Sequence, residues 1–157
     1  MYELLIKQLD AVLKDEKNFI TNTANFSAFI FNNLPDLNWA GFYFYDGEEL
    51  LLGPFQGQPA CVRIRIGKGV CGTSALKRKI MVIDNVDNFD GHIACDSNSK
   101  SEMVFPLIKN EELIGVFDID SPKLARFKED DKKNIELMVE KLLYLSDTDI
   151  IKKLFSN

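Results

Sequence analysis

Apolar side chains recur every three to four residues over the first third of the chain, which is the period of an amphipathic α-helix. Because the residue before a proline avoids the helical conformation, we expect the second of two helices to end at Leu34-Pro35. The two apolar stripes are Leu5, Leu9, Val12 and Leu13, then Phe19, Ile20, Thr23, Ala24, Ser27, Ile30 and Phe31.

The pattern then changes to short apolar runs that are typical of strands. In one of them, three aliphatic residues alternate with Arg63 and Arg65, which predicts a strand with one buried face. Asp46-Gly47 favours a hairpin turn between two such runs. The predicted strands are residues 38–45, 48–55, 60–66, 80–83, 103–108 and 113–119.

Two further helices are predicted, a short one over residues 73–79 and a long one over residues 128–145. Helices at both ends of a series of hairpins predict an α+β fold, with a central antiparallel sheet packed with N- and C-terminal helices. A chain of 157 residues has the size of one domain, so we expect a single domain over residues 1–157.

The composition limits the kinds of partner and compartment. A formal net charge of −5 with no basic stripe argues against nucleic acid as a partner. No apolar run reaches the roughly 18 residues that span a bilayer, and the N-terminus lacks a secretion signal, so we expect no membrane association. Three cysteines are too few for a disulfide scaffold, which predicts a cytoplasmic protein with reduced thiols.

Cys95 lies in a long polar loop ahead of an apolar strand. Residues 84–101 lack periodicity and are rich in Asp, Asn and Ser, and loops longer than about 12 to 15 residues are usually functional or disordered. A cysteine in such a loop is poorly placed to fill a core. Redox chemistry therefore explains this thiol better than packing does.

Two more cysteines precede Cys95. Cys61 begins a predicted strand and Cys71 begins a predicted helix, so either could be a small apolar core residue. The dipole of that helix is also expected to lower the pKa of Cys71. The three cysteines match no standard zinc spacing, and a Cys3His site with His92 is the weaker alternative. We interpret His92, the only histidine, as a residue that orders the loop.

Three acidic residues lie at the ends of two predicted strands. Asp118 and Asp120 share one face by alternation, and acids that end an apolar strand are costly unless they bind a ligand or reach solvent. Glu102 begins the partner strand, and the turn length decides whether it shares that face. Since clustered carboxylates repel one another, at least one pKa is expected to rise and leave a proton to donate.

Trp39 and Tyr43 lie four residues apart and therefore on one face of their predicted strand. The apolar residues that alternate with them lie on the other face. One face is expected to pack on helices while the other lines a cavity or a second layer. Trp39 is first expected in the core, and an aromatic wall for a small ligand is the alternative.

Residues 67–72 read GKGVCG and fit the G-x-G-x-x-G pattern of dinucleotide-binding turns. The helix that follows is barely two turns long, and hairpins surround the motif where a parallel sheet would be needed. These glycines are therefore expected to form a tight turn from strand to helix rather than a nucleotide site.

Taken together, these segments resemble the free methionine-(R)-sulfoxide reductases, which are stand-alone GAF domains. The resemblance runs from about residue 38 to about residue 145. It implies a GAF domain, an enzyme that reduces free L-methionine (R)-sulfoxide, and no cofactor or metal. The matching segments are NWAGFY (38–43), GPFQG (53–57), ACVRI (60–64), GKGVCGT (67–73), DGHIACD (90–96), SE (101–102) and GVFDIDS (115–121).

The resemblance also implies roles for single residues. Cys95 matches the nucleophile, which would become a sulfenic acid and then a disulfide with a second thiol. Cys61 matches the usual resolving cysteine, Cys71 matches one that can also pair with the nucleophile, and thioredoxin is the implied reductant. A homodimer is expected at the level of the family. The remaining roles are catalytic for Glu102 and Asp120, and substrate-binding for Trp39, Tyr43, Asp118, Ile93 and Ala94.

The alternative function is a non-catalytic GAF module that senses a small ligand or the redox state. A ligand sensor needs no second thiol, so Cys61 and Cys71 favour the enzyme. The residues leave open which of these two thiols resolves Cys95 and which carboxylate donates the proton.

Overall fold

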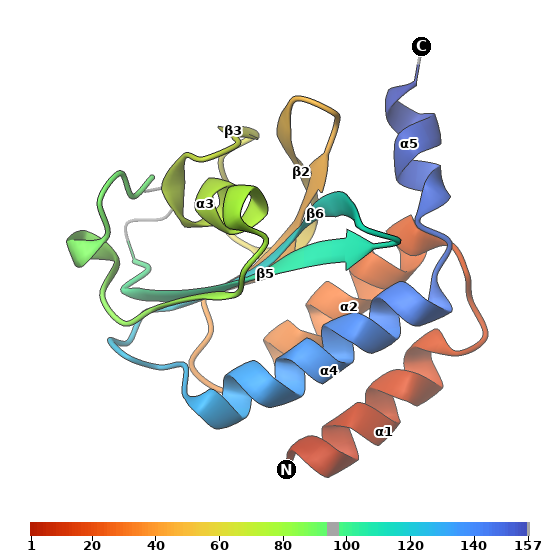
Figure 1. The fold of residues 1–157 in the computed structure, drawn as a ribbon. Coiled ribbons are helices and arrows are strands. Elements are labelled where there is room, and N and C mark those ends of the chain that lie inside the picture. Colours follow the sequence, from red (N-terminus) through yellow and green to blue (C-terminus); the bar gives the residue numbers. More distant parts are fainter. Residues whose placement is uncertain (94–97, 157) are drawn as a thin grey trace.

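The computed structural model describes residues 1–93 and 98–156, which form a six-stranded antiparallel sheet with helices on both faces (Figure 1). The strand order is β3-β2-β1-β6-β5-β4, and every neighbouring pair is antiparallel. This confirms the predicted α+β class. The strands are β1 (Trp39–Tyr45), β2 (Glu49–Gly57), β3 (Arg63–Arg65), β4 (Met81–Ile83), β5 (Ser101–Lys109) and β6 (Glu112–Ser121).

The helices divide between the two faces of the sheet. α2 and α4 pack against one face and α1 packs on both of them, whereas α3 covers the opposite face (Figure 1). No helix in the described part of the chain is long and apolar enough to cross a membrane. The helices are α1 (Tyr2–Leu13), α2 (Phe19–Asn33), α3 (Gly69–Lys77), α4 (Glu129–Leu145) and α5 (Asp149–Phe155), with a 3-10 turn η1 at Val86–Asn88.

The alternation of β1 divides its side chains between two separate apolar clusters. Ala40, Phe42 and Phe44 belong to the larger cluster, on the face covered by α2 and α4, which we call the helical face. Trp39 and Tyr43 belong to the smaller one, beneath α3, which we call the pocket face. The expectation of two differently used apolar faces is therefore confirmed.

Three predictions about local structure are wrong, and one helix was not predicted. The short helix begins at Gly69 rather than at residue 73, and β3 covers only Arg63–Arg65, so Cys61 precedes the strand rather than beginning it. Val62 was expected to be buried but is 62% exposed. α5 was not predicted, because a helix of two turns carries too little periodicity to stand out.

The glycines of residues 67–72 form a tight turn, as predicted. Gly69 adopts a φ of +61°, a conformation that disfavours other residues. A Cβ at Gly72 would approach the Arg65 carbonyl oxygen to 2.4 Å, so only glycine allows the helix to start so close to β3. The turn places the N-terminal end of α3, and with it Cys71, over the pocket face.

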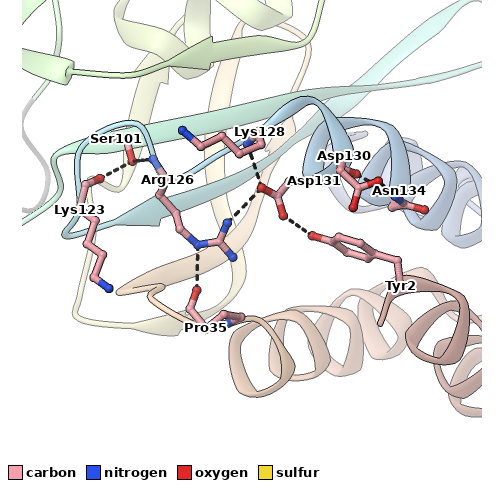
Figure 2. A network of polar contacts seen from close by, with 9 residues as sticks. All are labelled: Tyr2, Pro35, Ser101, Lys123, Arg126, Lys128, Asp130, Asp131 and Asn134. Atoms are coloured by element: carbon pink, nitrogen blue, oxygen red, sulfur yellow. Dashed lines mark hydrogen bonds and ion pairs between the residues drawn. The ribbon is translucent and has the colours of Figure 1, made fainter.

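A polar network fixes the end of the sheet at which β5 begins (Figure 2). Ser101 Oγ donates to the Lys123 carbonyl at 2.6 Å and accepts from the Arg126 N–H at 3.3 Å. The Arg126 guanidinium binds Asp131 Oδ2 at 3.0 Å, and Tyr2 donates to Asp131 Oδ1 at 2.5 Å. The start of β5 is thus tied to α4 and α1, one residue before Glu102.

Candidate active site

A small pocket, with a volume of about 40 Å³, lies on the pocket face between the sheet and α3. It meets the ends of β1, β5 and β6, the start of α3 and the loop that follows η1. The predicted site residues that line it are Trp39, Tyr43, Cys71, Ile93, Glu102, Asp118 and Asp120. Cys95 and Ala94, the other residues predicted near the substrate, lie outside the described residues.

The strand register brings all three carboxylates to the pocket. Glu102 on β5 lies directly opposite Asp120 on β6, so the two side chains point to one face. Asp118 follows on the same face by alternation, and its partner on β1 is Gly41. Asn110 and Glu111 both have positive φ and make the two-residue hairpin turn between these strands. An irregularity between Leu107 and Ile108 then shifts the register by one residue, so that Glu102 lies opposite Asp120 rather than Ile119. Glu102 therefore shares the face of Asp118 and Asp120, a question that the sequence left open.

Burial and mutual repulsion govern the charge of this cluster. Glu102 and Asp118 are 7% and 6% exposed. Loss of solvent, followed by the charges of Asp120 and Glu102, raises the pKa of Asp118 well above its usual range. The prediction that at least one carboxyl pKa rises is confirmed. Asp118 Oδ1 has no hydrogen-bond partner within the described residues, so it can accept a hydrogen bond from a ligand.

Aromatic rings form the apolar side of the pocket. Trp39 stacks on Tyr43 and on Phe55, with ring centroids 5.9 and 5.2 Å apart. The Trp39 indole N–H donates to the Gln58 carbonyl at 3.1 Å, which holds the ring in place. A Cβ at Gly41 would meet the Phe55 Cβ at 2.2 Å, so glycine is required beneath this stack. The expected core position of Trp39 is confirmed, since it is 3% exposed. Trp39 also lines the pocket, and its contact with a ligand stays a prediction.

Cys71 is a buried free thiol that faces the carboxylates. Its Sγ lies 3.9 Å from Glu102 Oε1, to which the thiol can donate. Burial raises the pKa of Cys71 above its usual range, and the negative charges of Asp118, Glu102 and Asp120 raise it further. The predicted lowering by the helix dipole is thus wrong, because the position at the helix start is also buried among acids.

Cys61 lies just outside this cluster. It is half-buried in the segment before β3, and its carbonyl oxygen accepts the Tyr43 hydroxyl at 2.9 Å. Cys61 is disulfide-bonded, whereas Cys71 is free, so the prediction of reduced thiols is wrong for Cys61. The structure therefore places Cys71 in the pocket and Cys61 beside it, next to the lining residue Ala60.

His92 lines the pocket, although it was interpreted from the sequence as a residue that orders the loop. Its Nε2 lies 3.7 Å from Glu102 Oε2, on the side of that carboxylate away from Cys71. A hydrogen bond to Glu102, opposed by partial burial, raises the pKa of His92. Its position as the only histidine, close to the candidate nucleophile, was the one signal available in the sequence. Nothing in the loop pattern indicated that it would face Glu102.

The described part of the site is suited to binding a cation. Three carboxylates face one small pocket, and among the described residues that line it the basic ones are His92 and the exposed Lys68. Such a cavity favours a positively charged ligand group. One donor atom each from Cys71, Glu102 and Asp118 lie within 4.8 Å of one another, so these three residues could also hold a metal ion.

Comparison with known proteins places the chain in a family. The GAF domain family model matches residues 22–142. A free methionine-R-sulfoxide reductase of Escherichia coli is 43% identical over 156 residues, which cover 99% of this chain and 94% of that protein. Protein YtsP of Bacillus subtilis is 51% identical over 143 residues, covering 90% of this chain and 88% of that protein.

A solved structure agrees with these sequence relatives. The structure of fRMsr of Staphylococcus aureus, in complex with its substrate, matches with a TM-score of 0.88 at 48% identity, covering 92% of this chain and 94% of that one. Fold, pocket and sequence therefore lead to one conclusion: this chain belongs to the GAF-domain family of the free methionine-R-sulfoxide reductases.

Proposed function

We propose that this protein reduces free L-methionine (R)-sulfoxide to methionine. The observation that carries the proposal is the pocket itself, in which three carboxylates face an aromatic wall and a thiol across a small cavity. A free amino acid with a sulfoxide side chain has a group for each part: an ammonium group, a polar oxygen and an S-methyl group.

The carboxylates account for the choice of a free amino acid. We assign the ammonium group to Asp118, because its Oδ1 is buried without a partner among the described residues and the surrounding charge is negative. A peptide-bound residue offers a neutral amide instead. Its binding would leave the acids buried and unpaired, which costs far more than losing one contact.

The aromatic wall accounts for the other end of the substrate. Trp39 and Tyr43 present stacked rings to the pocket, and sulfur and methyl groups pack favourably against such rings. Ile93 lines the same cavity, and Ala94 follows it in the chain. We assign these four residues to the S-methyl group.

The chemical step transfers one oxygen atom from substrate to enzyme. The Cys95 thiolate attacks the sulfoxide sulfur, and Glu102 or Asp120 protonates the sulfoxide oxygen. The S–O bond of the substrate then breaks as the hydroxyl passes to Cys95, which leaves methionine and a sulfenic acid. A second thiol displaces water from that acid and forms a disulfide.

We propose Cys61 as the main resolving thiol. It is the disulfide-bonded one, whereas Cys71 is free. Burial among carboxylates raises the pKa of Cys71, so Cys71 is a poor source of thiolate at neutral pH. Cys71 then acts as a neutral hydrogen-bond donor to Glu102 and as a secondary partner of Cys95.

The disulfide must be reduced before the next turnover. Thioredoxin, acting by thiol exchange, is the proposed reductant, and this requirement fits a cytoplasmic location. A homodimer stays a prediction at the level of the family. The names of the related reductases favour this enzyme over a non-catalytic sensing module.

A coupled assay tests the proposal. NADPH consumption by thioredoxin reductase and thioredoxin would be followed with the purified free (R) and (S) sulfoxides as separate substrates. We expect turnover of the (R) form alone, and none with Cys95→Ser. Absence of turnover with either epimer, in protein whose thiols are confirmed as reduced, would leave ligand sensing as the better function.

A further inference from the structure

We propose that Cys71, Glu102 and Asp118 form a binding site for Zn²⁺, and that zinc bound there excludes the substrate. The claim that zinc binds rests on the geometry of this chain alone. The claim that bound zinc excludes the substrate rests on the proposed function. The metal would act as an inhibitor of the site, not as a cofactor of the reaction.

The donor atoms already lie close to zinc geometry. Zinc takes sulfur at about 2.3 Å and carboxylate oxygen at about 2.0 to 2.2 Å, so neighbouring ligands of a tetrahedral site lie roughly 3.3 to 3.7 Å apart. The Cys71 Sγ and Glu102 Oε1 are 3.9 Å apart. No pair among the three donor atoms exceeds 4.8 Å, so side-chain movements of about 1 Å would complete the site.

An unsatisfied buried group indicates that this cluster is built to receive a cation. Asp118 is 6% exposed and lines the pocket, and its Oδ1 has no hydrogen-bond partner within the described residues. A buried carboxylate oxygen without a partner is costly, and a cation in the pocket removes that cost. The pocket volume of about 40 Å³ admits an ion with a few water molecules without displacing any element of the fold.

His92 supports one of the three ligands from behind. Its Nε2 contacts Glu102 Oε2 at 3.7 Å and leaves Oε1 directed toward Cys71. Residues that hold a metal-binding carboxylate in this way orient it and raise metal affinity. His92 is thus a positioning residue for the metal site rather than a ligand.

The thiol determines which metal is preferred. Mg²⁺ and Ca²⁺ take oxygen ligands and gain little from sulfur, whereas Zn²⁺ accepts thiolate and carboxylate together. On binding, the Cys71 thiol loses its proton to solvent and a Zn–S bond forms, with no oxidation or reduction. Three protein ligands leave a fourth position for water, and the metal occupies the place assigned above to the substrate ammonium group.

Metal binding can be measured apart from catalysis. The full-length variant Cys61→Ser/Cys95→Ser retains Cys71 as its one thiol, and Zn²⁺ affinity would be measured in it by competition with a chromogenic chelator. Co²⁺ in place of zinc gives a thiolate-to-cobalt absorption band that reports directly on Cys71. We expect one ion per chain, no effect of excess Mg²⁺, and this band.

Substitutions of single zinc-binding residues distinguish binding at this site from non-specific zinc binding elsewhere. Adding Cys71→Ser should remove the cobalt band and weaken zinc at least about 100-fold, and the isosteric Asp118→Asn should weaken it at least tenfold. His92→Gln should weaken it about tenfold, at the low end of the range for residues that support a ligand. Asp120→Asn, in the same pocket but outside the three donors, is the matched control and should change affinity no more than a few-fold. Absence of zinc binding, or binding that survives Cys71→Ser and Asp118→Asn in folded protein, would overturn the proposal.

Exclusion of the substrate is tested in wild-type enzyme. A single turnover of pre-reduced protein, without added thiol, would be followed by chromatography of the methionine formed. Zinc should slow this turnover, and both a chelator and higher substrate concentration should relieve the inhibition. A turnover rate that is unchanged by saturating zinc would contradict the claim that bound zinc excludes the substrate. If the metal-free enzyme does not turn over, the proposed function fails while the binding measurement still stands.

Discussion

The two faces of one sheet are put to opposite uses. On the helical face, the ring centroids of Phe42 in β1 and Phe117 in β6 lie 4.8 Å apart, and both rings pack on Phe26 of α2. On the pocket face, the neighbouring residues of the same strands are Gly41 and Asp118. Where the helical face has two packed aromatic rings, the pocket face thus has a buried acid opposite a glycine.

This difference separates what the protein needs for folding from what it needs for function. The helical face carries the larger apolar cluster and can supply most of the hydrophobic stabilisation. The acids of the pocket face oppose burial, and sites that break the rules of core packing in this way are usually functional. Substitutions on one face should therefore reduce stability, and substitutions on the other should reduce activity.

The largest effect is expected on the helical face. Phe117→Ala removes a fully buried ring that packs between Phe26 and Phe42, and should lower the free energy of unfolding by about 3 to 5 kcal/mol. Urea unfolding would measure it. Tyr144→Ala, at an aromatic residue that is 85% exposed, is the control and should change stability by less than about 0.5 kcal/mol. Similar losses in the two variants would contradict the account.

The reverse result is expected for Asp118→Asn. The substitution keeps the shape but removes the charge assigned to the substrate ammonium group, so kcat/KM should fall about 100-fold. The free energy of unfolding should not decrease, because a buried charge is removed. Steady-state kinetics and urea unfolding would be measured together, with the exposed Asp15→Asn as control. A destabilised variant with normal kcat/KM would assign Asp118 to folding instead.

A smaller effect is expected for His92→Gln, which keeps a hydrogen-bond donor near Glu102 but cannot titrate. We expect kcat to fall about tenfold, with little change in KM. The pKa of His92 is raised by Glu102, so the wild-type pH profile should contain a titration above the usual histidine range that the variant lacks. Profiles of identical shape would show that His92 only orders the loop.

A pH dependence of stability is also expected from Asp118. Asp118 has an ordinary pKa of 3.8 and a raised pKa in the folded state, so the folded protein holds this proton more tightly. Its contribution to stability is full below the ordinary value and is lost as the pH rises through the raised pKa. Asp118→Asn abolishes this loss. In thermal unfolding, the stability of the variant relative to wild type should therefore increase as the pH rises from the ordinary value of 3.8 through the raised pKa. A difference that stays constant would contradict the raised pKa.

The division of the sheet into two faces was predictable from β1, where alternation alone separates Trp39 and Tyr43 from Phe42 and Phe44. The same rule predicted that Asp118 and Asp120 lie on one face of their strand. The face on which the Glu102 side chain lies was not predictable, because the two-residue turn and the one-residue shift of register between Leu107 and Ile108 decide it together.

Other features of the site lacked any local signal. His92 lies in a segment without periodicity, and its contact with Glu102 joins residues from two distant parts of the chain. The raised pKa of Cys71 has the same origin, since it results from burial of the thiol of α3 and from the charges of three acids on β5 and β6. The position of Cys71 at the start of a helix, taken alone, predicted a lowered pKa instead.

The central claim is that the carboxylates of the pocket face recognise the ammonium group of a free amino acid. The most direct measurement compares kcat/KM for free and for N-acetylated L-methionine (R)-sulfoxide, in wild type and in Asp118→Asn. We predict that wild type prefers the free form by at least about 100-fold and that the variant loses most of this preference. Equal kcat/KM for the two substrates in wild type would contradict the claim.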